Sequence, residues 1–112
     1  MLYTVTSGKI TTVEDLLSHA KDVDAAALRY GCTKVYNDLL QTRFSNDIVI
    51  YSDLMHAYLN EMKLPDRKYN IACVIPKEFE EAGKFWETAC QNRGIDARIF
   101  FEKEEAQSWL NK

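Results

Sequence analysis

The residues best placed to do chemistry lie in one polar stretch, which reads NDLLQTRFSND from Asn37 to Asp47. We interpret Asp38 as the end of a strand, followed by a polar loop and by Ser45 just before an amphipathic run. Ser45 is either a phosphoacceptor, because a helix N-terminus favours a phosphate, or an N-cap, whose hydroxyl accepts a free backbone N–H. We favour the cap, because Asp38 and Asp47 oppose further negative charge at this point.

Ligands of a parallel α/β sheet bind at the carboxyl ends of its strands, so the polar side chains of this stretch are candidates for a surface site. For Asp38 we favour a structural role, in which its carboxylate accepts hydrogen bonds from loop amides. Elsewhere the chain offers little chemistry. His19 and His56 have no metal-ligating residue at the usual spacing, and no nucleophile–base pair or Gly-rich phosphate loop is evident. We therefore predict no catalytic residue, no metal and no cofactor, and a protein that is not an enzyme.

Composition narrows the class of protein further. The chain has 112 residues, 46% hydrophobic content and a net charge of −3, which predict one domain over residues 1–112. Basic and acidic residues are interspersed, so the basic stripe of a nucleic-acid-binding protein is missing. The three cysteines, Cys32, Cys73 and Cys90, form no CxxC pair and are expected to be reduced thiols. Neither a signal peptide nor an apolar run of ~20 residues is visible, so we expect a cytoplasmic protein without a transmembrane segment.

Four β-rich runs alternate with helical periodicity. The predicted strands are Leu2–Ser7, Lys34–Leu39, Tyr69–Pro76 and Ile95–Phe101. The third run is continuously apolar, as in a strand that is buried on both faces. The predicted helices run from Thr11 to Tyr30 with an interruption near Asp24, from Ile48 to Met62, from Phe79 to Cys90, and from Glu102 to Leu110.

Local signals mark the ends of the first helical region. Thr11 and Glu14 have the spacing of a capping box, and Asp24 is a candidate cap for a second short piece. Gly31 is placed to end that piece with a left-handed residue. This βα order, four times over, predicts an α/β fold of four βα units, with a mainly parallel sheet flanked by helices.

Aromatic and methionine side chains are numerous for this length. Most sit at helical or strand spacing, so a plain hydrophobic core is the favoured interpretation. The alternative is an apolar pocket between the helices and the sheet, because Met and aromatic surfaces adapt well to apolar partners. The candidate lining residues are Tyr51, Met55, Tyr58 and Trp86.

The runs GKITTVEDLLSH, VYNDL, NIACVIP and GIDARIFFEKEEAQSWL together resemble the small bacterial proteins of the STAS/SpoIIAA-like superfamily. The resemblance covers nearly the whole chain and implies a SpoIIAA-like fold of four βα turns. Anti-sigma factor antagonists of this superfamily carry a D-S-S-G-type motif around the phosphorylated serine, where this chain has SNDI. Many relatives also carry an additional strand before the first one, so the first strand here is expected to be an exposed edge that invites pairing with another chain.

The resemblance implies a regulatory module whose partner is either a different protein or a second copy of itself. The implied partner-binding residues lie around the end of the second strand: Asp38, Thr42, Ser45, Asn46 and Asp47. The alternative function is a carrier or sensor that binds a small apolar or lipid-like ligand, as in the CRAL-TRIO-type lipid carriers that some members of the superfamily resemble.

Overall fold

The fold is built on one sheet of four parallel strands, arranged in the order of the sequence. The computed structural model describes residues 1–45, 47, 49–50, 52–53, 70–92 and 95–112. The strands are β1 (Leu2–Ile10), β2 (Lys34–Phe44), β3 (Asn70–Val74) and β4 (Asp96–Phe100). The α/β class and the parallel sheet are thereby confirmed. Strands β2 and β3 are central, and β1 and β4 are the two edges.

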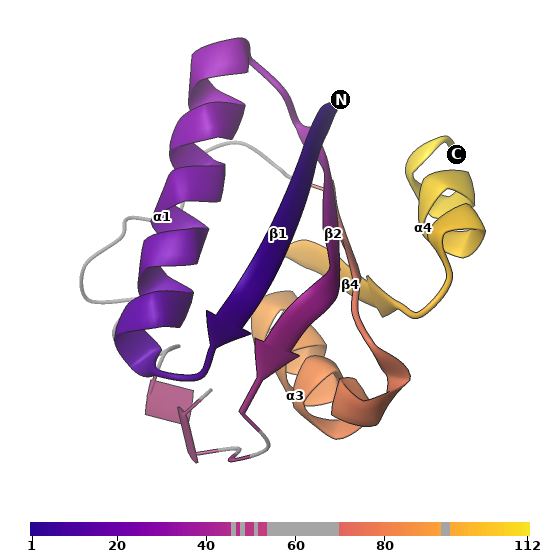
Figure 1. Ribbon diagram of the computed structural model, residues 1–112. Coiled ribbons are helices and arrows are strands. Elements are labelled where there is room, and N and C mark those ends of the chain that lie inside the picture. Colours follow the sequence, from indigo (N-terminus) through magenta and orange to yellow (C-terminus); the bar gives the residue numbers. More distant parts are fainter. Residues whose placement is uncertain (46, 48, 51, 54–69, 93–94) are drawn as a thin grey trace.

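Helices cover both faces of this sheet (Figure 1). They are α1 (Val13–Tyr30), the 3₁₀ turn η1 (Lys77–Phe79), α3 (Glu80–Gln91) and α4 (Lys103–Leu110). Helices α1 and α3 lie on one face, and α4 lies on the other. Of the helix predicted from Ile48 to Met62, residues 49–50 and 52–53 are helical, and most of the rest lies outside the described residues.

The core follows the alternation of side chains along each strand. Tyr36 and Val74 face α4 and pack against its Leu110. Leu39 and Cys73 face the other way, where they pack with Phe79 of η1. Strand β3 is therefore covered on both sides, as its continuous apolar run predicted.

Helix α1 differs from its prediction at its start and in its middle. Its N-cap is Thr12, whose hydroxyl accepts the N–H of Asp15 at 3.1 Å, so the predicted capping box at Thr11 is wrong by one residue. The helix is continuous over 18 residues, and the predicted break near Asp24 is absent. No Gly or Pro lies in this stretch, and burial of one face against the sheet outweighs its polar residues. Gly31 ends the helix with φ 65°, as predicted.

Strands β1 and β2 are both longer than their predictions. The register of β1 against β2 shifts between Val5 and Ser7, and Gly8 takes a φ of 101°. With this irregularity β1 continues to Ile10. In β2, the segment after Leu39 that was predicted as a loop is strand, because Gln41 to Phe44 pair with the end of β1. The predicted end of the strand at Asp38 is thus wrong.

The described chain has the dimensions of one domain. Its radius of gyration is 12.9 Å, close to the ~13 Å of a compact domain of about 100 residues. Among the residues that the structure describes, no helix combines the length and the hydropathy needed to cross a membrane.

Candidate interaction surface

Asp38 lies inside β2 and joins that strand to α4. Its Oδ1 accepts the N–H of Leu40 at 3.1 Å, and its Oδ2 lies 3.3 Å from Nζ of Lys103. Pairing of β2 with β3 ends at this residue, opposite Val74. We favoured a role for Asp38 in holding a loop; the structure instead places it within β2, where its carboxylate bonds the strand backbone and Lys103 of α4.

Thr42 is buried and is unavailable to a partner. Its side chain is 1% exposed, and its hydroxyl donates to the carbonyl of Thr6 on β1 at 2.9 Å. This bond ties the two strands together at the register shift, because Thr6 lies between Val5 and Ser7. The structure therefore removes Thr42 from the predicted contact residues.

Ser45 and Asp47 share the turn that follows β2. The Ser45 hydroxyl accepts the N–H of Asp47 at 3.0 Å, and the Asp47 carboxylate accepts the N–H of Val49 at 3.0 Å. Because Val49 is the first described helical residue, Asp47 holds the capping position, and the predicted cap at Ser45 is displaced by two residues. Asn46 lies outside the described residues.

A polar contact inside the core was missed by sequence reasoning. The Thr4 hydroxyl donates to Oδ1 of Asn37, and Nδ2 of Asn37 donates to Sγ of Cys73 at 3.6 Å. Burial raises the pKa of the Cys73 thiol to about 12, while the Asn37 hydrogen bond acts in the opposite direction. A thiol with such a pKa stays protonated at neutral pH and is a poor nucleophile. The three residues come from three neighbouring strands, so no local sequence signal links them.

His19 is half-buried on α1 and carries a buried ring nitrogen. Its Nε2 is buried without a hydrogen-bond partner in the described part of the chain. Burial lowers the pKa of His19, and the charge of Asp22 partly opposes this shift. No group of three His, Cys, Asp or Glu side chains among the described residues could hold a metal ion.

An apolar cavity lies between α1 and α3 on one face of the sheet. Its volume is about 130 Å³, and its polar lining residues are His19, Asp24 and Asn37. Trp86, one of the four candidate pocket residues, is among its lining residues. The other predicted pocket residues, Tyr51, Met55 and Tyr58, lie outside the described residues. Pockets for drug-sized ligands usually measure about 300–1,000 Å³, so this cavity is small for one.

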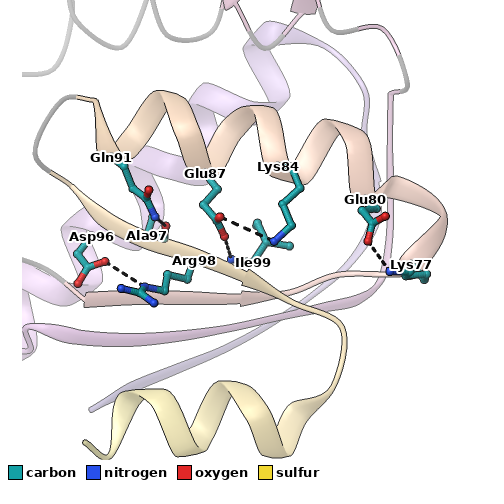
Figure 2. A network of polar contacts seen from close by, with 9 residues as sticks. All are labelled: Lys77, Glu80, Lys84, Glu87, Gln91, Asp96, Ala97, Arg98 and Ile99. Atoms are coloured by element: carbon teal, nitrogen blue, oxygen red, sulfur yellow. Dashed lines mark hydrogen bonds and ion pairs between the residues drawn. The ribbon is translucent and has the colours of Figure 1, made fainter.

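The β4 edge of the sheet is closed by side chains of α3 (Figure 2). Oε2 of Glu87 accepts the N–H of Ile99 at 2.6 Å, and Nε2 of Gln91 donates to the carbonyl of Ala97 at 3.3 Å. Edge strands otherwise present unpaired backbone groups to which another strand can bind. These two side chains occupy such groups on β4 and oppose the addition of a strand there.

The β1 edge is open by comparison. No side-chain hydrogen bond from the described residues reaches its outer side. Tyr3 is 60% exposed and Val5 is 78% exposed, and both lie on the face of the sheet that α4 covers farther along. The Tyr3 ring packs on the Tyr36 ring, with centroids 5.4 Å apart. Lys9 is the only charged side chain of β1, and the strand has no proline. We call the outer backbone of residues 2–5, with the side chains of Tyr3 and Val5, the open edge surface.

In comparisons with known proteins, no family model, no curated protein and no solved structure matches this chain.

Proposed function

We propose that this protein is a non-enzymatic regulatory or scaffold module of the SpoIIAA-like type that binds another protein through the open edge surface. The observation that carries the proposal is the difference between the two edges of the sheet. Two α3 side chains block β4, whereas no side chain of the described residues bonds the outer backbone of β1, beside two exposed apolar side chains. An extended segment that adds to such an edge gains main-chain hydrogen bonds, and the side chains beside the edge supply specificity.

The location differs from the one that the family resemblance implied. Thr42 is buried, and Asp38 is bound to Leu40 and Lys103. Ser45 and Asp47 are the described residues of that set that remain near the surface, and the hydrogen bonds that they accept from Asp47 and Val49 are explained by the turn itself. The open edge surface is therefore the stronger candidate, and the turn at Ser45 is its rival.

The test compares matched variants as baits for partner capture. Val5→Lys places a charge on the open edge surface, while Val49→Lys makes the same change at a residue that is 63% exposed and lies outside the sheet. A double variant, Ser45→Ala with Asp47→Ala, tests the rival turn. Thermal unfolding of each bait checks that it is folded.

We expect a partner that still binds the Val49→Lys protein and the double variant. Its affinity for the Val5→Lys protein should be at least tenfold lower, about 1.4 kcal/mol. Capture that survives Val5→Lys and disappears with the double variant would contradict the proposal and favour the turn.

A second candidate function, binding of a small apolar ligand, rests on the cavity between α1 and α3. Its lining is mainly apolar, and three polar side chains could orient a ligand. Native mass spectrometry of the protein purified from its own source tests this function. We expect the mass of the empty chain, whereas a stoichiometric apolar adduct that is released on unfolding would favour the carrier. In the same spectrum, one added phosphate mapped to Ser45 would support the phosphorylation switch.

A further inference from the structure

We propose that the cavity between α1 and α3 binds a small neutral molecule with one aromatic ring and one hydroxyl group, and that the side-chain amide of Asn37 binds this hydroxyl. The inference rests on the second candidate function and deepens it, because it names the size and the chemical class of the ligand. It does not involve the open edge surface, so its failure would leave the proposed binding of another protein unaffected.

The size of the cavity limits the size of the ligand. The volume is about 130 Å³. An apolar cavity of about 150 Å³ in a protein core stays dry and binds benzene, whereas pockets for drug-sized ligands start at about 300 Å³. Protein interiors contain few voids larger than a water molecule, so a cavity of this size is a candidate for an occupant. A single aromatic ring is the ligand that matches it.

The lining favours an aromatic ring without a charge. Trp86 of α3 and Phe79 of η1 are lining residues, and aromatic rings attract one another in offset or edge-to-face arrangements. No lysine or arginine is among the described lining residues, so a ligand anion would be buried without a cationic partner, which is costly. Asp24, the acidic residue among them, is already engaged in another interaction. A neutral ligand is therefore favoured.

Asn37 is the polar side chain best placed to bind a hydroxyl group. It lies in the central strand β2, is 5% exposed and lines the cavity. Among the described residues, its Oδ1 accepts from the Thr4 hydroxyl, and its Nδ2 donates to Sγ of Cys73 at 3.6 Å. An amide offers two N–H donors and two acceptor sites, and a thiol sulfur is a weak acceptor. Asn37 therefore retains a donor and an acceptor site for a ligand.

A hydroxyl group matches this remaining capacity. It both donates and accepts, so it can bond to either atom of the amide. A ligand oxygen is also a stronger acceptor for Nδ2 of Asn37 than the sulfur of Cys73 is. Benzene would leave these groups of the amide unused, whereas phenol would bond to one of them. The net gain from one hydrogen bond corresponds to about a fivefold tighter affinity.

His19 is the rival site for the hydroxyl. It also lines the cavity, and its Nε2 has no hydrogen-bond partner in the described part of the chain. His19 is half-buried, whereas Asn37 is buried. Because water competes less for the more deeply buried group, we place the hydroxyl at Asn37.

NMR titration of the wild-type protein with three probes tests the ligand class. Benzene has no polar group, phenol adds a hydroxyl, and benzoate adds a negative charge. The signal to follow is the indole N–H of Trp86, which lines the cavity. Trp109, the second tryptophan of the chain, lies on α4 and packs on the other face of the sheet, so its indole N–H is the internal control.

We expect phenol to shift the Trp86 signal with a dissociation constant below about 1 mM and to bind about fivefold more tightly than benzene. Benzoate should not shift it, and the Trp109 signal should stay unchanged with all three probes. A ligand bound this weakly is lost during purification, in agreement with the empty chain expected in native mass spectrometry.

Two matched pairs of variants locate the site. Ala20→Leu fills the cavity from α1, while Ala25→Leu makes the same change at an exposed residue of that helix. Asn37→Leu removes the amide, while Thr4→Val removes the hydroxyl that bonds to it and leaves the amide in place. We expect Ala20→Leu to weaken phenol binding about tenfold or more, and Asn37→Leu to remove the preference for phenol over benzene. Both controls should behave as the wild type does.

Thermal unfolding checks that each variant is folded. A preference for phenol that survives Asn37→Leu would overturn the role of Asn37. If Asn37→Leu does not fold, His19→Leu decides, because loss of the preference in that variant would place the hydroxyl at His19 instead.

Equal binding of phenol and benzene to the wild type would overturn the hydroxyl and leave the second candidate function in place. If no probe moved the Trp86 signal, the inference and the second candidate function would both fail.

Discussion

The Glu87 carboxylate accepts the N–H of Ile99 at 2.6 Å, and its second oxygen lies 3.8 Å from Nζ of Lys84. The Glu87 side chain is 19% exposed, whereas that of Lys84 is 53% exposed. The hydrogen bond from Ile99 to Glu87 is thus less exposed to water than the ion pair between Lys84 and Glu87. Hydrogen bonds to charged groups contribute about 1.5–3 kcal/mol, and exposed ion pairs contribute about 0–1 kcal/mol.

Glu87→Ala should therefore lower the free energy of unfolding by about 1–3 kcal/mol, because the N–H of Ile99 loses its acceptor. Lys84→Ala is the matched control and should change it by less than about 1 kcal/mol. Urea unfolding of both variants measures the difference. Equal losses would show that the ion pair, rather than the backbone bond, carries the effect.

His19 should make stability depend on pH. Burial lowers its pKa in the folded state below the usual 6.5, so below that pH the unfolded chain binds a proton that the folded chain does not. Above pH 6.5, the contribution of His19 to the free energy of unfolding should be constant. As the pH drops below 6.5, the free energy of unfolding should fall. Urea unfolding between pH 7.5 and 5.5 measures the slope. His19→Gln should flatten the slope, and an unchanged slope in that variant would assign the pH dependence to other groups.

The three thiols should differ in reactivity. Cys73 is buried with a pKa raised to about 12, Cys90 is buried, and Cys32 is partly exposed. A maleimide reagent should label Cys32 first and label Cys73 only after unfolding, because the thiolate is the reactive form. Peptide mapping at successive times measures the order. Early labelling of Cys73 in folded protein would contradict the packing of its strand.

At the scale of elements, helices and strands whose faces are buried were predictable, and their ends were less so. The apolar run of β3 predicts a strand, and the periodicity of α3 and α4 predicts helices, from local sequence alone. The second half of β2 does not, because Gln41, Thr42 and Arg43 are polar and only pairing with β1 makes them strand. The contacts of Glu87 with β4 and of Thr4 with Asn37 join distant segments, so the sequence alone could not identify them.

The glycine that ends α1 is a signal that is visible in the sequence, and its effect can be tested. Gly31 has φ 65°, and an added Cβ would contact nothing within 4 Å, so a substitution there acts on the backbone alone. Gly31→Ala should cost about 1–2 kcal/mol, because residues with a side chain disfavour this conformation. Gly31→Asn should cost less, since Asn tolerates it better. Thermal unfolding ranks the two, and a stabilising Gly31→Ala would contradict the left-handed end of α1.

At the scale of the whole molecule, the sheet has two edges of opposite character. Two side chains of α3 close β4, whereas in the described part of the chain nothing bonds the outer side of β1 beside Tyr3 and Val5. An open edge is an aggregation hazard unless a partner covers it. The proposed function follows from this asymmetry.

Amide hydrogen exchange of the wild type, resolved by residue with NMR, tests the open edge most directly. At high dilution, the amides of residues 2–5 that do not bond to β2 should exchange much faster than the amide of Ile99, which Glu87 protects. If all amides of residues 2–5 exchanged as slowly as that of Ile99 at every concentration, the β1 edge would already be closed, and the account of an open interaction edge would be wrong.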